Sequence, residues 1–398
     1  MSIAKSFFES GVYSFSRLMG WYGAQNDVRL NLAHIQAFAQ CSNWPRFENL
    51  IRYYWEMYNG VDMIKTAPFI MDIEPTDKCN LSCPFCPTGN KLDTGRSTSK
   101  LDLDNFKRVV DQTYEKMYFA CFSEWGEPLL NPETYDMIEY LNRKNVYTMV
   151  SSNMSFVNSP ENVDRLINSG LDYLTIAIDG ITQKTYDKYR IGGNLRNVLT
   201  NSMQVINRRN ELGLKKPFVE WQFVIFKHNQ DEAKHVRRLA TMMGVDRLYL
   251  KKAYIEDVDW QPDKDEDFKT ELFSNASLQS CARPWRNLVI RADGGLSPCC
   301  YTYYKKDDFH HISDFGGDIS KMWNSDTYKR SRRTIYDIAT GKEVPEDKKF
   351  VCDGCIRYNQ KPLISVNENA DQGRLEKVVA FREKARKGGR KHKPTFEV

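Results

Sequence analysis

Between residues 68 and 252 the sequence alternates short apolar runs with longer amphipathic segments, and this alternation restricts the possible folds most strongly. The apolar runs are FIMDIEP, MYFACFSE, VYTMVSS, DYLTIAI, FVEWQFVIF and DRLYLKK. The amphipathic segments between them lie at 101–116, 131–144 and 160–169, within 182–212, and at 230–243. Buried strands that alternate with helices indicate parallel β/α units. Because six units are too few for an eight-stranded barrel, we predict an α/β fold, a partial (β/α)6 TIM-like barrel.

The rest of the chain is predicted to form four segments around a barrel domain at 66–252. Residues 1–65 are predicted to be a helical extension. A set of residues there recurs at helical spacing and predicts a packed helix face: Phe47, Leu50, Ile51, Tyr54, Trp55 and Tyr58. Residues 253–275 are acidic and weakly periodic, so we predict a linker. A small cysteine-bearing domain is predicted at 276–360, and a helix with a basic tail at 361–398.

The composition argues against several classes of protein. No stretch approaches the ~20 apolar residues that span a bilayer, and the first residues lack the apolar core and cleavage site of a secretory signal. The net charge of +5 is mild and gathers in 382–393, which favours a solvated tail over nucleic-acid binding. Ten cysteines without an export signal argue against a disulfide framework. We therefore expect a cytoplasmic protein whose clustered cysteines bind metal.

Three cysteines follow the first predicted strand: Cys79, Cys83 and Cys86, with the spacing C-x3-C-x2-C. Parallel β/α proteins carry their chemistry in the loops after the strands, which is where this trio falls. A structural zinc site needs four protein ligands, and residues 87–116 contain no further Cys or His. Three thiolates on a cubane [4Fe–4S] cluster leave one iron open, and an open metal position is typical of a site that binds an exogenous molecule.

The motif and its position resemble the radical S-adenosylmethionine (SAM) superfamily, whose signature is C-x3-C-x2-C after the first strand of a partial (β/α)6 barrel. The resemblance implies that SAM chelates the open iron. It further implies that one electron splits SAM into methionine and a 5′-deoxyadenosyl radical, which abstracts hydrogen from the substrate. An electron donor such as flavodoxin or ferredoxin is therefore expected as a partner.

Two segments resemble SAM-binding parts of that family. WGEPLLN, after the second predicted strand, is similar to the GGEP motif, with Trp125 in place of the first glycine. The resemblance implies that Gly126, Glu127 and Pro128 position the SAM amino group, while an ordinary turn is the alternative. Phe85, inside C-x2-C, occupies the position that packs near the adenine.

Further candidates for SAM contacts lie at the ends of later strands. Ser151 and Asn153 end the third strand, where the family contacts the ribose, although both residue types also form ordinary turns. Asp179 and Arg190 are implied to lie near SAM. The guanidinium of Arg190 is the better candidate for the SAM carboxylate because it can bind that group through two hydrogen bonds, and a surface ion pair is the alternative. Gln222 on the fifth strand is a further candidate.

A second group of cysteines comprises Cys281, Cys299, Cys352 and Cys355. A long-spaced pair and a C-x2-C can close a four-coordinate site with zinc or with a second [4Fe–4S] cluster, and the spacing leaves both open. The pattern resembles the auxiliary-cluster domain called SPASM, in its shorter twitch form because no cysteine follows Cys355. The resemblance implies one auxiliary [4Fe–4S] cluster held by four thiolates.

Three residues are candidates for catalysis. Cys300 is an alternative ligand to Cys299, a buried structural thiol, or a thiol that gives a hydrogen atom to a substrate radical. Cys121 on the second strand raises the same question, and the buried structural role is favoured for both. His228, after the fifth strand, is placed to act as a base, and a satisfied histidine near a helix start is the alternative.

We predict a radical SAM oxidoreductase or epimerase that acts on a carbohydrate-like small molecule. Abstraction of hydrogen beside oxygen or nitrogen, loss of a proton, and transfer of one electron to the auxiliary cluster together make a two-electron oxidation. A maturase that modifies a ribosomal peptide is placed second because no extra peptide-binding domain is recognisable. A metal-stabilised binding or electron-transfer module is the non-enzymatic alternative, and the open three-cysteine site disfavours it.

Overall fold

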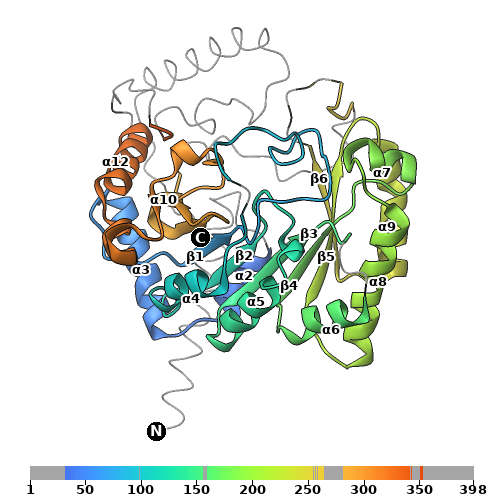
Figure 1. Ribbon diagram of the computed structural model, residues 1–398, viewed down its shortest axis with the longest axis horizontal. Helices are drawn as coiled ribbons and strands as arrows, with labels where there is room; N and C mark the ends of the chain where they lie inside the picture. The colour runs from blue at the N-terminus through green and yellow to red at the C-terminus, as the bar shows by residue number, and fades with distance from the viewer. Residues whose placement is uncertain are drawn as a thin grey trace, which may run out of the picture.

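The computed structural model describes residues 32–97, 99–155, 159–253, 259–263, 281–340 and 350–352, with the single residues 255, 257 and 342. Within these residues one sheet has the strand order β6-β5-β4-β3-β2-β1-β7-β8-β9 (Figure 1). The strands are β1 (Ile70–Ile73), β2 (Phe119–Phe122), β3 (Tyr147–Ser152), β4 (Tyr173–Ala177), β5 (Phe218–Ile225), β6 (Arg247–Lys252), β7 (Asn287–Ile290), β8 (Gly295–Ser297) and β9 (His310–His311). Neighbours from β6 to β7 are parallel, whereas β8 and β9 pair antiparallel.

Helices connect the parallel strands and cover the sheet (Figure 1). Before and within the predicted barrel they are α2 (Leu32–Gln40), α3 (Trp44–Tyr58), α4 (Leu103–Asp111), α5 (Thr134–Arg143), α6 (Pro160–Asn168), α7 (Gln183–Tyr189), α8 (Leu195–Glu211) and α9 (Ala233–Met243). Beyond it are α10 (Arg283–Arg286), α11 (Ile319–Trp323) and α12 (Asp326–Thr340). The six predicted strands and the helices between them are confirmed, as is the partial barrel.

Local sequence explains where these elements begin and end. Asp102 and Ser159 accept hydrogen bonds from backbone N–H groups in the first turns of α4 and α6, as N-cap residues do. The predicted helical segment 182–212 is two helices, because the chain turns between α7 and α8 at Gly192, whose φ is +85°. Strands β2 and β4 are buried along their whole length, which is why they read as continuous apolar runs.

The predicted packed face of the N-terminal helix is wrong in part. In α3, Leu50 is buried, but Ile51, Trp55 and Tyr58 are exposed, with Trp55 at 62%. Polar side chains occupy inward positions instead. Arg46 is buried and donates to the backbone oxygen of Cys41 at 2.8 Å. Hydrogen bonds of this kind make polar burial tolerable, and a periodicity based on apolar residues alone misses it.

The C-terminal segment continues the barrel sheet. Strand β7 pairs parallel with β1, with Asp72 opposite Val289. Helix α12 lies beside α3, although the two are far apart in sequence (Figure 1). Trp323 Nε1 donates to the backbone oxygen of Thr66 at 2.8 Å, and this bond helps to join the two ends of the described chain. The predicted C-terminal helix and tail, Cys355, and residues 1–31 lie outside the described residues.

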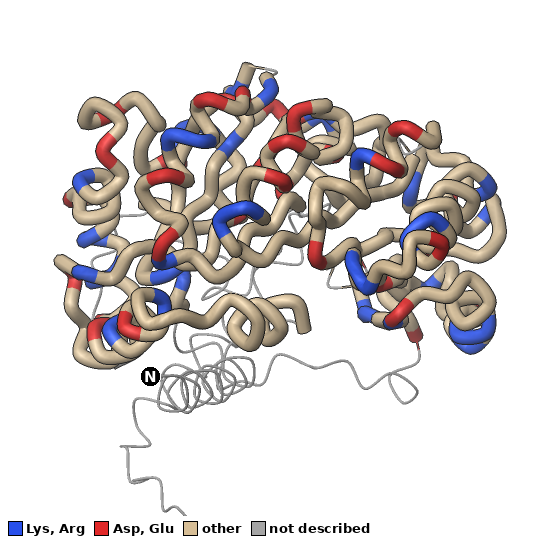
Figure 2. Tube along the Cα trace, turned by 90° about the horizontal axis from the view of Figure 1, so that it is seen from below, with Lys and Arg blue, Asp and Glu red and all other residues tan. Residues whose placement is uncertain are grey.

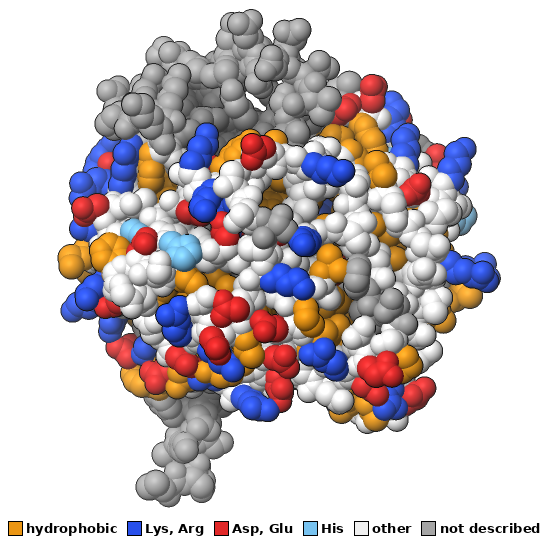
Figure 3. All heavy atoms as spheres, in the orientation of Figure 1, with side chains coloured by type: hydrophobic (Ala, Val, Ile, Leu, Met, Phe, Trp, Pro, Cys, Tyr) orange, Lys and Arg blue, Asp and Glu red, His pale blue; other side chains and the backbone are white. Residues whose placement is uncertain are grey.

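Charge is mixed over the described surface. Figure 2 shows basic and acidic positions interleaved along the chain, and Figure 3 shows both signs among apolar side chains on one face. This mixture agrees with the mild net charge of +5. In the described part of the chain, no helix is long and apolar enough to cross a membrane.

Candidate functional site

The N-terminal cysteine trio lies in the loop after β1. Cys83 is buried, Cys79 and Cys86 are half-buried, and all three are free thiols. The loop turns tightly, since Cys86 N–H donates to the backbone oxygen of Cys83 at 3.2 Å and Asn90 N–H donates to that of Cys86 at 2.8 Å. Gly89 permits the turn, because a Cβ there would lie 2.4 Å from the Cys83 oxygen.

The charge of Arg190 and nearby N–H donors favour thiolates at the trio, against the effect of burial, and thiolates are the form that binds an iron–sulfur cluster. Burial raises the pKa of all three thiols, and the positive charge of Arg190 acts against this rise. The Leu81 N–H and the Asn153 amide point at Cys79 Sγ, at 3.5 and 3.8 Å, and such donors stabilise sulfur ligands. No His, Cys, Asp or Glu trio among the described residues is arranged for one metal ion. Each thiolate of a cubane binds a different iron, so cubane ligands lie farther apart than ligands of a single ion.

The segment from Trp125 to Pro128 packs directly against the cysteine loop. Gly126 is required here, because a Cβ would lie 1.7 Å from the backbone oxygen of Thr76. The N–H of Glu127 donates to the backbone oxygen of Lys78 at 2.8 Å. Pro128 begins a short 3-10 turn (Pro128–Leu130). The segment therefore determines where the loop carrying Cys79 begins.

The Glu127 side chain is buried and points toward the end of β3. It accepts a hydrogen bond from Ser152 Oγ at 2.8 Å and another from Asn153 N–H at 2.9 Å. Burial raises the pKa of this carboxyl, and these hydrogen bonds oppose the rise. The Asn153 amide in turn donates to Asn80 Oδ1 at 2.9 Å. Ser151 and Gln222, on β3 and β5, are half-buried.

Asp179 and Arg190 form a buried ion pair beside the trio. Arg190 Nε lies 2.7 Å from Asp179 Oδ2, and the two side chains are 15% and 0% exposed. The other oxygen of Asp179 accepts the N–H of Val224 at 2.6 Å, which anchors the carboxylate to β5. Arg190 is therefore not a surface residue, and its charge acts on Cys83.

An aromatic cluster lies next to the cysteine loop. Phe85 contacts Trp260, with ring centroids 5.1 Å apart, and Tyr189 at 6.5 Å. His228 belongs to the same cluster, 5.2 Å from Trp260, and its Nε2 lies 3.2 Å from the backbone oxygen of Thr185. Burial and the charge of Lys188 lower the pKa of His228 to about 4, so the imidazole is neutral at pH 7. Trp260 lies within the predicted linker and was not a predicted site residue.

Cysteines of the second group line one cavity. Cys281, Cys299 and Cys352 contribute to its wall together with Arg283 and Tyr301. Three thiols around one cavity suit an auxiliary iron–sulfur cluster, whose usual ligands are thiolates.

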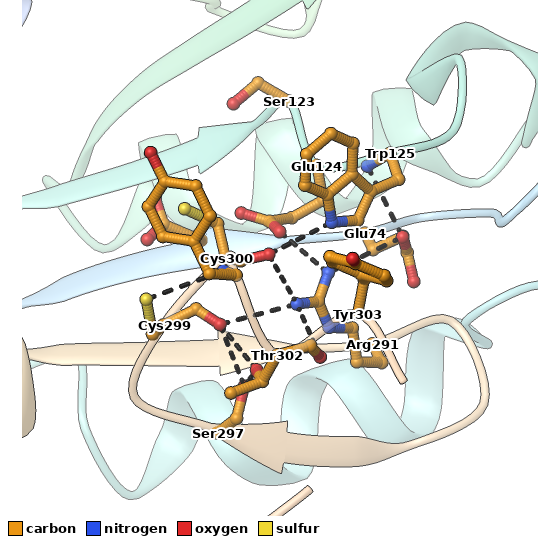
Figure 4. Close-up of polar contacts among 12 residues, drawn as sticks. Glu74, Ser123, Glu124, Trp125, Arg291, Ser297, Cys299, Cys300, Thr302 and Tyr303 are labelled. Atoms are coloured by element: carbon orange, nitrogen blue, oxygen red, sulfur yellow. Dashed lines mark hydrogen bonds and ion pairs between the residues drawn. The ribbon is translucent and has the colours of Figure 1, made fainter. Parts of the chain in front are cut away.

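Arg291 joins this second group to the barrel (Figure 4). Its side chain is fully buried after β7, and Nη1 lies 2.7 Å from Glu124 Oε2. Nη2 donates to the backbone oxygens of Cys300 and Thr302, both at 3.1 Å. Burial raises the pKa of Glu124 well above its usual range, and the charge of Arg291 opposes the rise. Sequence reasoning missed this contact because Glu124 and Arg291 are 167 positions apart and neither belongs to a motif.

Cys121 and Cys300 lie near this junction. Cys121 is buried on β2, and its Sγ is 2.8 Å from Ser123 Oγ. Burial raises the pKa of Cys121, and the charge of Asp72 acts in the same direction. Cys121 is therefore a protonated thiol at pH 7. Cys300 is half-buried and follows Cys299 in the loop that Arg291 holds.

Comparison with known families places two domains on the chain. Residues 73–240 match the family model described as the Radical SAM superfamily. Residues 281–356 match SPASM, described as an iron-sulfur cluster-binding domain. The two matched regions include the cysteine trio and the second cysteine group, respectively.

Known relatives share parts of the sequence and the fold. The PqqA peptide cyclase of Gluconobacter oxydans (strain 621H) is 24% identical over 247 residues, which cover 62% of this chain and 63% of the relative. The PqqA peptide cyclase of Methylorubrum extorquens (strain PA1) is 28% identical over 211 residues, 51% of this chain and 52% of the relative. The chain thus spans only about half to three fifths of these relatives. Streptococcus suis SuiB bound to S-adenosylmethionine shares the fold, with a TM-score of 0.54, 14% identity and 72% of each chain covered.

Proposed function

Since the chain belongs to the radical SAM superfamily and carries a C-terminal SPASM domain, we propose that it modifies a peptide by a radical reaction. The radical SAM domain implies SAM and a [4Fe–4S] cluster, and the SPASM domain implies auxiliary iron–sulfur binding. The observation that supports a peptide substrate is the sequence similarity to two PqqA peptide cyclases. This similarity favours a peptide over the carbohydrate-like molecule that we predicted first. It lends no support to an oxidoreductase or epimerase acting on sugars.

The N-terminal trio would hold the SAM-binding cluster in this proposal. A bound cluster supplies the electron that splits SAM into methionine and a 5′-deoxyadenosyl radical. Cys79, Cys83 and Cys86 would each donate one thiolate. Gly126 and Glu127 support the loop that carries them, through the close approach to Thr76 and the hydrogen bond to Lys78.

The buried groups around the trio would bind SAM. Arg190 would pair with the SAM carboxylate, and its ion pair with Asp179 holds the guanidinium in place. Phe85 would pack near the adenine, as a member of the aromatic cluster that it forms with Trp260 and Tyr189. Asn153 and Ser151 would contact the ribose, and Gly126, Glu127 and Pro128 would face the amino group. Gln222 is proposed as a further contact.

The peptide step balances as a two-electron oxidation. A peptide C–H bond would lose a hydrogen atom to the 5′-deoxyadenosyl radical, which would become 5′-deoxyadenosine. The peptide carbon radical would lose one proton to a base and one electron, for which an auxiliary cluster would be the acceptor, and a new bond would form in the peptide. Cys281, Cys299, Cys352 and Cys355 would hold that cluster, with His228 as the proposed base. Cys121 or Cys300 would act only in the alternative reaction, in which a thiol returns a hydrogen atom to the peptide radical and no net oxidation occurs.

The test compares substrate classes on the same preparation. The reconstituted protein, kept free of oxygen, receives SAM, a reductant, and either short ribosomal peptides or a panel of sugars and cyclitols. We expect one peptide to lose the mass of two hydrogen atoms while 5′-deoxyadenosine forms in proportion. Cys352→Ala should cleave SAM without completing the peptide product, and Cys41→Ala, outside both cysteine groups, should behave as wild type. Oxidation of a sugar without any modified peptide would contradict the proposal.

A further inference from the structure

Arg283 places a buried positive charge in the cavity lined by the second cysteine group. It begins α10, two residues after Cys281, and contributes to the cavity wall with Cys281, Cys299 and Cys352. Its side chain is only 11% exposed. The Nε atom is buried and has no hydrogen-bond partner among the described residues. A buried guanidinium with an unused donor is costly, and an acceptor bound in this cavity would satisfy it.

Among the described residues Asp72 is the carboxylate that pairs with Arg283, and this pairing satisfies only part of the guanidinium. Arg283 Nη1 lies 3.5 Å from Asp72 Oδ2, a long contact for an ion pair. The same Asp72 oxygen also accepts the side-chain amide of Asn287 at 3.1 Å. The sulfur atoms of Cys281, Cys299 and Cys352 line the same cavity as Arg283 and would be thiolates when they hold a cluster. The cation therefore lies in a cavity lined by these cysteines and also contacts Asp72, on strand β1 of the barrel.

We propose that Arg283 raises the reduction potential of the auxiliary cluster; this inference rests on the cluster ligands assigned under the proposed function. A [4Fe–4S] cluster with four thiolates carries negative charge, and reduction adds another negative charge. A buried cation beside the sulfurs stabilises the reduced form more than the oxidised form, because the attraction grows with the charge. N–H donors directed at sulfur act in the same direction. Arg283 thus makes the cluster a better acceptor for the electron that leaves the peptide radical.

Asp72 has the opposite effect on the proposed cluster, because its charge is negative. Its negative charge lies on the barrel side of Arg283 and offsets part of the positive charge that the cluster experiences. Removal of the Asp72 charge should therefore raise the potential, whereas removal of the Arg283 charge should lower it. If the ion pair had only a structural role, its loss would change the reduction potential in the same direction in both variants. Shifts of the potential in opposite directions would therefore show that the two charges act electrostatically.

The experiment is a redox titration of the auxiliary cluster by electron paramagnetic resonance. All variants are made in a Cys83→Ala background, so that the auxiliary signal is observed alone. We expect Arg283→Met to lower the midpoint potential, Arg283→Lys to keep it near the starting value, and Asp72→Asn to raise it. Arg208→Met, which removes an exposed arginine that pairs with Asp164 on a distant surface, should leave it unchanged.

Each other outcome overturns the inference. Equal potentials for Arg283→Met and Arg283→Lys with full iron content would show that the charge has no effect. If Arg283→Met fails to assemble the cluster, the midpoint potential of Asp72→Asn becomes the test. An unchanged potential in Asp72→Asn would contradict the proposal. Absence of any iron–sulfur signal in the Cys83→Ala background also overturns it. The readout requires no peptide, so a failed peptide assay leaves this result unaffected.

Discussion

The indole Nε1 of Trp125 donates a hydrogen bond to the backbone oxygen of Cys300 at 3.0 Å (Figure 4). Trp125 stands where the related motif has a glycine, and its ring also packs edge-on against Tyr303. One side chain therefore connects the proposed SAM-binding segment with the loop that carries Cys299, a proposed auxiliary ligand. This contact gives a physical reason for the departure from the motif.

Trp125→Phe is expected to lower the free energy of unfolding by about 1 kcal/mol. The ring would keep most of its packing, but the Cys300 oxygen would lose its indole donor, and one hydrogen bond contributes roughly that amount. Urea unfolding of the wild type and the variant measures the difference. Trp55→Phe serves as the control because Trp55 is 62% exposed and should change stability by less than about 0.5 kcal/mol. Equal effects of the two substitutions would contradict the proposed link.

Gly126→Ala is expected to abolish SAM cleavage. A Cβ at this position would lie 1.7 Å from the Thr76 backbone oxygen, so the loop that leads to Cys79 would have to move. The measurement is 5′-deoxyadenosine formation together with iron content. Gly213→Ala is the matched control: its Cβ meets no atom within 4 Å, and its φ of +65° costs only about 1 kcal/mol of strain. Full activity of Gly126→Ala would show that this close approach does not position the site.

Asp179→Asn is expected to weaken SAM binding and to destabilise the fold by about 3 kcal/mol. The substitution leaves the buried Arg190 guanidinium without its anionic partner, and an unpaired buried charge is costly. Asp164→Asn removes a carboxylate at the same 2.7 Å distance from an arginine, but on the exposed surface, so it should cost less than about 1 kcal/mol. Equilibrium dialysis with SAM and urea unfolding test the pair, and equal losses from both variants contradict the assignment.

Acidification from pH 6.5 to pH 4.5 is expected to destabilise the wild type partly through His228. Its pKa in the fold is about 4, below the ordinary value of about 6.5, so the unfolded chain binds a proton in this range that the folded chain does not. The stability contribution is therefore present above pH 6.5 and decreases as the pH falls toward 4. For a half-buried ring we expect about 1 kcal/mol. Urea unfolding of His228→Gln at both pH values should show a smaller loss than wild type; an identical loss contradicts this account.

The sequence contained enough information to predict the barrel and the position of the cysteine trio. Parallel strands buried on both faces appear as apolar runs, and helices with polar outer faces separate them, so both signals are local. The trio follows β1, in a loop of the kind in which parallel β/α proteins carry their active sites. These predictions needed only the order of residues along the chain.

The contacts across the site could not be predicted in the same way. Arg291 reaches Glu124 through an ion pair between β7 and the end of β2, and no local pattern marks either residue. Trp260 lies in an acidic segment that looked like a linker, yet its ring packs on Phe85. The inward face of α3 was misjudged because Arg46 is buried by hydrogen bonding rather than by hydrophobicity. Each of these features depends on which segments meet in three dimensions.

The proposed chemistry depends most directly on an open cluster at the N-terminal trio. The decisive measurement is 5′-deoxyadenosine formation by the protein reconstituted without oxygen, supplied with SAM and a strong reductant. We predict that wild type forms it, and that Cys83→Ala forms none while retaining the iron of the second cysteine group. Formation at the wild-type rate by Cys83→Ala, or none by fully loaded wild type, would contradict an open, SAM-binding cluster at this trio.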